Sequence, residues 1–552
     1  MYKFYNMKKK ICSAILLAAT ITSFAQNNKP STPPINWQLM DWQQDGYPGI
    51  SLEKAYNELL KNKKPLKKII VSIVDCGLDD KHPDLAGMEW TNKKEIPGNN
   101  IDDDHNGFVD DVHGWNFTAN LSTETFEEVR EYIKLRSQFE NKIDTLSLKA
   151  NPQFAYWKKI VDAKNKKVDE MEGKQKGTAM FLNALQTLQN YWSKKLMKDT
   201  VFVKEIKNNP PDNAADSSVM KARTFFMMAT ANETRNIDSI ALVLIISKVK
   251  ENSEDNNYVL QAAQTVIEKN DAEFFRKEAV GDDPNTNIKK NYGNASTTPA
   301  EPHGTECAGT IAALRNNNIG GNGITNSVAL MTVKITATHS HADERDKDVA
   351  NAIRYSVDNG AQIISMSFGK LISPQKKWVD EAVKYAEQKG VLLIFGAGNG
   401  AANNDTIPFY PTAACTDKKL VTNCIKVGAS TYDSTLVAGF SNYGTKTVDV
   451  YAPGVSIYTT SINNTYESVK GTSFACPMVA GLAALIWSYY PTLTYRQVKE
   501  CIKKSAAPID ILVIKPGTGE KVPFRTLSST GGIVNAYNAI KIADAMIKKK
   551  NK

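Results

Sequence analysis

Residues 361–399 read AQIISMSFGKLISPQKKWVDEAVKYAEQKGVLLIFGAGN and contain two apolar runs with an amphipathic segment between them. The two runs, 361–369 and 391–399, are nearly continuous in apolar residues, as expected of parallel strands that are covered on both faces. The segment between them repeats apolar residues at helical spacing and closes with Lys389-Gly390, which is typical of a helix C-terminus. A strand, a helix and a second strand in this order predict a parallel sheet with helical crossovers.

The same rhythm recurs on both sides of this stretch. Runs typical of strands lie at 67–75 (KKIIVSIVD), 329–335 (ALMTVKI) and 425–430 (IKVGAS), and residues 346–360 (DKDVANAIRYSVDNG) carry a helical apolar stripe. These segments predict an α/β fold with a doubly wound, mostly parallel sheet. In such a sheet, functional residues gather beyond the C-terminal ends of the strands.

Residues 121–290 interrupt this pattern, because they are rich in Lys, Glu, Gln and Asn, poor in Gly and helical in period. They predict a helical insertion, and TFEE (125–128) predicts a capping box that opens its first helix. A coiled-coil arm is the alternative, although the heptads are irregular. We divide the chain accordingly into a leader (1–25), an N-terminal segment or short pro-region (26–65), the first part of the α/β domain (66–120), the insertion (121–290), the rest of the α/β domain (291–510) and a C-terminal extension with a basic tail (511–552).

The charge balance limits what the protein binds. The 552-residue chain has 68 Lys and Arg against 59 Asp and Glu, a formal net charge of +9. Four of these positive charges lie in the leader, so the remainder carries about +5. This balance is too mild, and too evenly mixed with acids, to predict nucleic-acid binding.

The leader, MKKKICSAILLAATITSFAQ (7–26), has a basic start, a short apolar run and small residues before its end. It predicts a signal peptide cleaved after about Ala25; a membrane anchor is the alternative, but the apolar run is too short to span a bilayer comfortably. No later segment offers about 20 unbroken apolar residues. We therefore expect an exported protein, periplasmic or extracellular, with no integral membrane span. In such a compartment Cys415 and Cys424 either form a disulfide or stay reduced.

Four polar residues fall at the predicted strand ends or helix starts of this one sheet: Asp75, His303, Asn399 and Ser473. Taken alone, each has an ordinary structural explanation as a cap or turn residue. Together they supply what acyl transfer needs, because a serine hydroxyl requires an imidazole base, and that base requires a carboxylate that orients it. A side-chain amide is suited to hold the oxyanion that forms.

The four residues stand in motifs that resemble, in order and wording, the signature blocks of the subtilisin-like serine proteases (subtilases). The motifs are VDCGLDDKHPDL, HGTECAG, ISMSFG, FGAGN and GTSFACPMVAG, and the resemblance covers about half of the chain. It implies that Asp75 is the orienting acid, His303 the general base, Ser473 the nucleophile and Asn399 the oxyanion amide. It also implies polypeptide substrates, which pair with the backbone of Ser367, Phe368 and Gly369, and a pocket walled by Gly396, Ala397 and Gly398 for the residue before the scissile bond. No cofactor is expected for catalysis.

Three features depart from the family pattern. Glu306 and Cys307 replace a second His and an aliphatic residue, so that Glu306 either alters the field at the base or faces solvent. Lys370 replaces a common glycine and puts substrate fit at that edge in doubt. The acid and the base stand 228 positions apart, far more than the usual few tens, so the insertion leaves the core between them and is placed to overhang the cleft.

An acidic loop, IDDDHNGFVDDVHGW (101–115), has oxygen-bearing residues at the spacing of the first part of a calcium loop. It predicts either a structural calcium site or an acidic solvated turn. The candidate ligands are Asp102, Asp104, Asn106, Asp110 and the carbonyl of Phe108. The nearby residues Asp79, Asp80, His82 and Asp84 are typical of local turns and caps.

Two rival functions were weighed against peptide hydrolysis. A catalytically silent subtilase-like scaffold would bind a partner protein through the insertion, but all four chemical positions hold competent residues. A lipase or esterase of the α/β-hydrolase type would need a G-x-S-x-G elbow, which GTSFA does not supply. The leading prediction is an exported serine endopeptidase that acts through an acyl-enzyme, with activity that falls below about pH 6.5 as His303 becomes protonated. The oligomeric state stays open.

Overall fold

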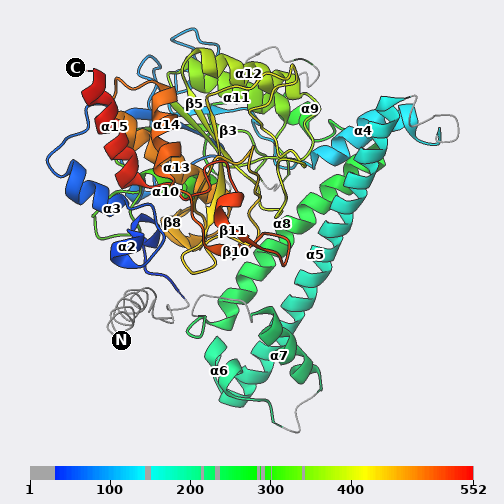
Figure 1. Ribbon diagram of the computed structural model, residues 1–552. Helices are drawn as coiled ribbons and strands as arrows, with labels where there is room; N and C mark the ends of the chain where they lie inside the picture. The colour runs from blue at the N-terminus through cyan, green and yellow to red at the C-terminus, as the bar shows by residue number, and fades with distance from the viewer. Residues whose placement is uncertain are drawn as a thin grey trace, which may run out of the picture.

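The computed structural model describes residues 32–142, 151–212, 217–230, 237–282, 286, 292–299, 301–338 and 342–550. Within these residues a seven-stranded parallel sheet forms the centre, in the order β2-β3-β1-β4-β5-β6-β7 (Figure 1). Its strands are β1 (Ile69–Asp75), β2 (Gly114–Asn116), β3 (Val328–Lys334), β4 (Ile363–Met366), β5 (Leu392–Gly396), β6 (Cys424–Ser430) and β7 (Val450–Pro453). The predicted α/β fold with a parallel sheet is confirmed. The predicted leader lies outside the described residues.

Helices cover both faces of this sheet (Figure 1). One face carries α11 (Asp346–Asp358) and α12 (Lys376–Gln388), and the other carries α10 (His303–Ala312), α13 (Thr472–Tyr489), α14 (Tyr495–Ser505) and α15 (Ala536–Lys550). Strand β1 serves both cores, because Val71 and Ile73 face α13 whereas Val74 faces α11. This two-sided burial explains the continuous apolar runs of the sequence.

The central helix α13 is almost completely buried. Among the described residues it is the one helix long and apolar enough to cross a membrane, but 89% of that apolar window lies inside the protein. The last helix, α15, is only partly a basic solvated element, since Ala539, Ile540 and Ala543 belong to the main core. Cys415 and Cys424 are both buried, and neither is bridged.

Two small hairpins stand beside the main sheet. One is formed by β8 (Ile457–Ser461) and β9 (Thr465–Val469), and the other by β10 (Leu512–Ile514) and β11 (Lys521–Pro523). The first runs directly into α13 through Lys470 and Gly471. The second lies in the segment predicted to be a C-terminal extension.

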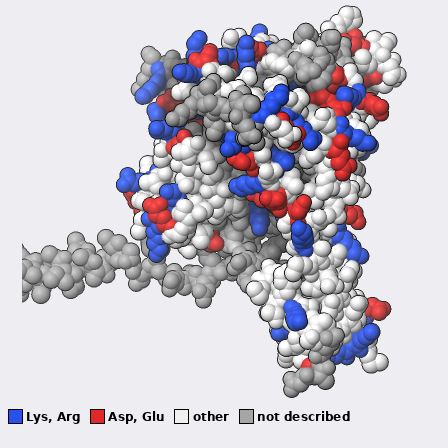
Figure 2. All heavy atoms as spheres, turned by 90° about the vertical axis from the view of Figure 1, so that its right-hand side faces the viewer, with Lys and Arg blue, Asp and Glu red and all other residues white. Residues whose placement is uncertain are grey.

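The insertion projects from the body as a helical arm (Figure 1). It consists of α4 (Glu127–Phe139), α5 (Pro152–Leu196), α6 (Val203–Asn208), α7 (Ser217–Ala229), α8 (Leu242–Lys269) and α9 (Arg276–Ala279). The 45-residue helix α5 runs alongside α8 for much of its length. On the face shown in Figure 2, acidic and basic side chains are interspersed over arm and body. These helices, α4 to α9, confirm the predicted helical insertion.

Each end of the arm has its own apolar core. The proximal core, next to the sheet domain, contains Phe126, Trp157 and Val259, together with Ile372 from the sheet domain. The distal core joins the far part of α5 to α7 and to the start of α8, around Trp192, Phe226 and Leu242. Between the two ends, Lys248 Nζ on α8 lies 4.0 Å from Glu467 Oε1 on β9. The arm thus touches the hairpin that leads into α13.

Buried charges attach the base of the arm to the sheet domain. Lys370 Nζ lies 2.7 Å from Glu127 Oε2 on α4 and 3.0 Å from Asp346 Oδ1 on α11, and all three side chains are nearly fully buried. Arg130 Nη2 adds a second ion pair to Glu127 at 2.9 Å. The Lys370 side chain therefore points into this cluster. It points away from the substrate edge, where its replacement of a glycine put substrate fit in doubt.

The capping box predicted at TFEE (125–128) is wrong. Helix α4 has Phe126 at its N-cap position and receives no side-chain cap from that residue. The backbone N–H of Glu127 instead donates to Asp343 Oδ2 at 3.0 Å, and the Thr125 hydroxyl lies buried without a hydrogen-bond partner. A carboxylate brought in by the tertiary fold thus replaces the local cap.

Candidate active site

The C-terminal end of β1 and the first residue of α10 bring an acid and an imidazole together. Asp75 Oδ1 lies 2.8 Å from His303 Nδ1; the carboxylate is almost fully buried, and the imidazole is 34% exposed. The close approach requires Gly304, because a Cβ there would lie 2.0 Å from the Gly77 carbonyl oxygen. A proton on Nδ1 leaves Nε2 of the ring as the free lone pair.

The charges around His303 set the protonation of its ring. Burial lowers the pKa of His303, but the Asp75 carboxylate, its hydrogen bond to the ring and the charges of Glu306 and Glu301 outweigh burial and raise the pKa to about 9. Glu306 is itself only 5% exposed, which excludes a solvent-facing position. Burial, with Glu467 and Asp75 nearby, raises the pKa of Glu306 to about 7. The neutral imidazole therefore predominates above about pH 9, well above the pH 6.5 expected from an isolated histidine.

Ser473 lies in the first turn of α13, which begins at Thr472 as the sequence predicts. Pro477, one turn later, has no N–H to donate to the Ser473 carbonyl. Ser367 Oγ donates to that freed oxygen at 2.7 Å, and the Ser473 hydroxyl in turn donates to the Ser367 carbonyl oxygen at 3.0 Å. The helix N-terminus is thereby tied to the segment that follows β4.

Ser473 also lies beside the imidazole. The Phe474 ring centroid is 5.6 Å from that of His303, and Cys307 Sγ on α10 lies 3.5 Å from the Ser473 carbonyl oxygen. No hydrogen bond joins the Ser473 hydroxyl to His303 in this structure, because the hydroxyl is directed at Ser367. A rotation about the Cα–Cβ bond to another staggered position releases it.

Asn399 and the first turn of α13 border one open space. Asn399 Oδ1 accepts from the backbone N–H of Thr472 at 2.9 Å and from its hydroxyl at 3.0 Å, which fixes the amide and leaves Nδ2 as its free donor. A Cβ built on Gly471, whose φ is +154°, would lie 3.6 Å from Asn399 Nδ2 and 3.6 Å from the Ser473 backbone nitrogen. Two N–H donors thus flank a space that stays empty because residue 471 is a glycine. The N-terminus of α13 favours negative charge in that space.

The two segments predicted to hold substrate lie on either side of one aromatic ring. A Cβ on Gly369 would lie 2.4 Å from Phe409 Cε1, and a Cβ on Gly398 would lie 3.1 Å from the same atom. The half-buried Phe409 therefore fills space between the 367–369 and 396–398 segments. No sequence pattern marks this residue, because its segment follows β5 in an irregular connection.

The acidic loop brings three carboxylates together. Ligand oxygens of Glu95, Asp102 and Asp104 lie within 4.8 Å of one another, and none of the three is ion-paired among the described residues. Asp110 does not belong to this group; its two oxygens accept the backbone N–H groups of residues 98–100 at 2.8, 3.2 and 2.9 Å. An all-oxygen set fits a calcium ion. Glu95 was missed because it stands outside the regular acidic spacing.

An acid in contact with an imidazole, with a serine hydroxyl at the start of a neighbouring helix, is the residue set of the serine hydrolases, a class that includes the serine peptidases. The chain belongs to the subtilase family, whose profile matches residues 66–531. It is a subtilisin-like serine endopeptidase.

Curated relatives agree with this assignment. Subtilisin BL from Lederbergia lenta is 35% identical over 235 residues, which cover 41% of this chain and 79% of the relative. Thermitase from Thermoactinomyces vulgaris is 35% identical over 238 residues, 43% of this chain and 74% of the relative. A solved structure, that of the prenylagaramide maturation protease PagA, aligns over 44% of this chain and 82% of its own at 27% identity, with a TM-score of 0.37.

Proposed function

We propose that the protein is an exported endopeptidase that hydrolyses peptide bonds through an acyl-enzyme on Ser473. The observation that carries the proposal is the 2.8 Å contact between Asp75 and His303, placed beside the N-terminus of α13. His303 Nε2 takes the proton of the Ser473 hydroxyl as that oxygen attacks the substrate carbonyl. The imidazolium, stabilised by Asp75, then gives the proton to the leaving amine, and water releases the acyl group by the same steps in reverse order.

Asn399 Nδ2 and the Ser473 N–H are the proposed oxyanion donors. The open space beside Gly471 supports this role, because both donors border it. Preorganised donors of this kind act on charge that develops only in the transition state, and loss of one typically costs about 10²–10³ in kcat. The amide is held by Thr472 before any substrate arrives.

The proposed substrate is an extended polypeptide that adds a strand to the edge at Ser367–Gly369. Its residue before the scissile bond enters the space walled by 396–398. Because the Phe409 ring occupies part of that space, we propose that a small side chain, such as alanine, fits there best. The proposed substrates do not include nucleic acid, in keeping with the interspersed charges of Figure 2.

Catalysis is proposed to need no cofactor. A calcium ion held by Glu95, Asp102 and Asp104, with Asn106 and the Phe108 carbonyl as further candidate ligands, would stabilise the loop and supply no chemistry. Export is proposed from the signal-peptide pattern of residues 7–26.

A second candidate, the catalytically silent scaffold, is favoured by one observation: the Ser473 hydroxyl donates to Ser367 and not to His303. Labelling with a fluorophosphonate fluorophore at pH 7 and pH 9.5 separates the two candidates. If the protein is an endopeptidase, the wild type is labelled, and faster at pH 9.5 than at pH 7. Ser473→Ala is not labelled, and His303→Ala is not labelled at a measurable rate. Equal labelling of wild type and Ser473→Ala refutes the proposed enzyme. It is also refuted if neither protein is labelled at either pH while circular dichroism shows that both are folded.

A further inference from the structure

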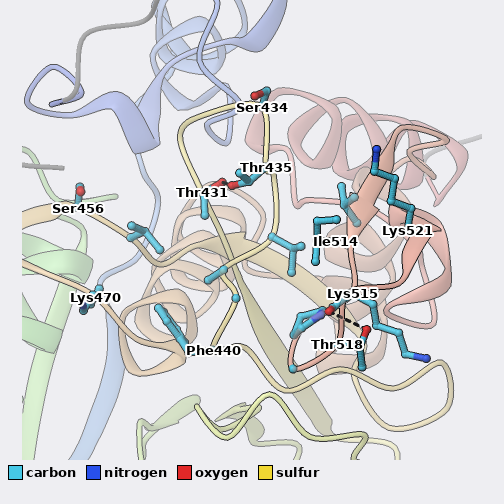
Figure 3. Close-up of a pocket in the computed structure, with 18 of the residues that line it drawn as sticks. Thr431, Ser434, Thr435, Phe440, Ser456, Lys470, Ile514, Lys515, Thr518 and Lys521 are labelled. Carbon is cyan, nitrogen blue, oxygen red and sulfur yellow. Dashed lines mark hydrogen bonds between the residues drawn. The ribbon is translucent and has the colours of Figure 1, made fainter. Parts of the chain in front are cut away.

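A cavity opens near the start of α13, and none of Ser367, Phe368 and Gly369 lines it. It measures about 890 Å³, and four segments line it: the 431–440 loop after β6, residues 455–456, the end of β9 with Lys470, and the β10–β11 hairpin (Figure 3). Lys470 stands three residues before Ser473. On another wall, the Phe440 carbonyl accepts the N–H of Ala401 at 2.8 Å, two residues after Asn399.

The direction of a bound peptide follows from this placement. The segments proposed to hold substrate before the scissile bond, 367–369 and 396–398, contribute no residue to the cavity wall. A chain that passes over Ser473 leaves those segments on the acyl side. Lys470 and the cavity lie outside those segments, which leaves them available to the half that departs with the amine.

The cavity wall has a distinctive chemistry. Its charged residues are Lys470, Lys515 and Lys521, and it contains no Asp or Glu. Lys515 Nζ is paired with Glu520 Oε2 at 3.0 Å, whereas Lys470 and Lys521 are exposed and form no ion pair among the described residues. Two cations in a cavity wall without an ion-pair partner among the described residues attract an anionic group.

The hairpin also supplies an apolar surface. Leu512 and Ile514 alternate with the buried Val513 along β10, so they share one face of the hairpin, and they are 61% and 50% exposed. Figure 3 shows Ile514 and the hairpin lysines across the cavity from Thr431, Thr435 and Phe440. Large aliphatic side chains exposed beside a cavity are suited to bind an apolar partner.

We propose that the β10–β11 hairpin and Lys470 form a specificity pocket for the leaving-group half of the substrate. The pocket selects an apolar residue that is followed or preceded by an acidic one. The inference rests on the proposed peptidase function and adds the substrate class to it. The occupant is thus a polypeptide segment with a carboxylate side chain within the first three residues after the cut.

The test uses internally quenched peptides that share one acyl half and differ only after the scissile bond, with Glu, Gln or Lys at the second or third position. A p-nitroanilide with the same acyl half, which has no residue after the bond, reports catalysis alone. Wild type is expected to cleave the best Glu peptide about 10-fold faster, in kcat/KM, than its Lys counterpart. This preference should shrink at 1 M NaCl, where the screening length is about 3 Å.

The double variant Lys470→Gln/Lys521→Gln should reduce the Glu-to-Lys ratio to about 1 and leave p-nitroanilide hydrolysis unchanged. Leu512→Ser/Ile514→Ser should lower kcat/KM for peptides with Leu after the cut by about 5-fold. The control Lys504→Gln removes a charge from α14, outside the cavity, and should change neither ratio. A wild-type ratio of 1 with normal p-nitroanilide turnover overturns the pocket alone. Absence of all hydrolysis, including that of the p-nitroanilide, overturns the peptidase function and the pocket with it.

Discussion

Replacement of Glu306 by Gln should move the acidic limb of the pH–rate profile to lower pH. Glu306 lies three residues after His303 on α10, so the two side chains are neighbours about 5–6 Å apart on the helix surface. Around pH 9, where His303 titrates, Glu306 is ionised because its own pKa is about 7. Its negative charge therefore stabilises the imidazolium and delays formation of the neutral base. Asp75 and Glu301 add to this negative field at the His303 ring.

The size of the effect follows from Coulomb's law. Removal of one charge at about 6 Å changes the interaction by about 0.7 kcal/mol in water and about 2.8 kcal/mol at an effective dielectric constant of about 20. These limits correspond to about 0.5 and 2 pH units. A shift of about one unit would raise kcat/KM about 5-fold at pH 8 and leave it unchanged at pH 10.5, because the base is neutral there in both proteins.

The assay is kcat/KM for a p-nitroanilide between pH 6 and pH 10.5, which reports the pKa of the free enzyme. The matched control is Glu172→Gln, which removes one carboxylate from the exposed face of α5, where it pairs with Lys176 at 3.5 Å. Its profile should superimpose on that of wild type. The reasoning is refuted if the wild-type limb already lies near pH 6.5, or if Glu306→Gln and wild type give the same limb.

Three further perturbations test other parts of the structure. Lys370→Met leaves Glu127 and Asp346 buried without their lysine and should lower the free energy of unfolding in urea by about 3–5 kcal/mol. The control Lys504→Met breaks an exposed pair with Glu500 and should leave the free energy of unfolding almost unchanged; equal effects of the two variants would contradict the buried cluster. Phe409→Ala should raise kcat/KM for substrates with Phe or Leu before the scissile bond at least 10-fold relative to Ala, and an unchanged preference would show that the ring does not limit that pocket. Addition of a chelator should lower the melting temperature of wild type without direct loss of p-nitroanilide hydrolysis below that temperature, and should have little effect on Glu95→Gln/Asp102→Asn; a wild-type melting temperature indifferent to both chelator and added calcium would reduce the acidic loop to a turn.

The sequence predicted the elements whose signals are local. The apolar runs 67–75 and 391–399 contain β1 and β5, because burial on both faces of the sheet requires continuous apolar residues. The predicted stop at Lys389-Gly390 ends α12, because Gly390 adopts a left-handed conformation. The candidate residues Asp75, His303, Asn399 and Ser473 were found through motifs, whose order along the chain carries the geometry. The structure brings Asp75 and His303 into contact, places the ring of Phe474, the residue after Ser473, 5.6 Å from that of His303, and holds Asn399 against Thr472.

What the sequence did not predict depends on partners distant in the chain. The start of α4 is capped by Asp343, more than 200 residues away, so a local capping box was inferred in error. Lys370 was suspected at the substrate edge, but its ammonium group reaches Glu127 in the insertion. The burial of Glu306 and the place of Phe409 follow from packing between separate elements, and neither has a periodic or compositional signal.

The two separate cores of the arm have a consequence for how such a chain changes over time. Because the distal core shares no residue with the proximal one, the segment between about the middle of α5 and the first turns of α8 folds around its own apolar side chains. If this segment were replaced by another helical unit, or deleted and α5 joined to α8 by a short loop, the buried ion cluster at Lys370 and the peptidase sheet would stay intact. The outer half of the arm is thus a region where this enzyme can acquire a new binding surface, and the contact of Lys248 with Glu467 is the part of it that reaches toward the catalytic helix.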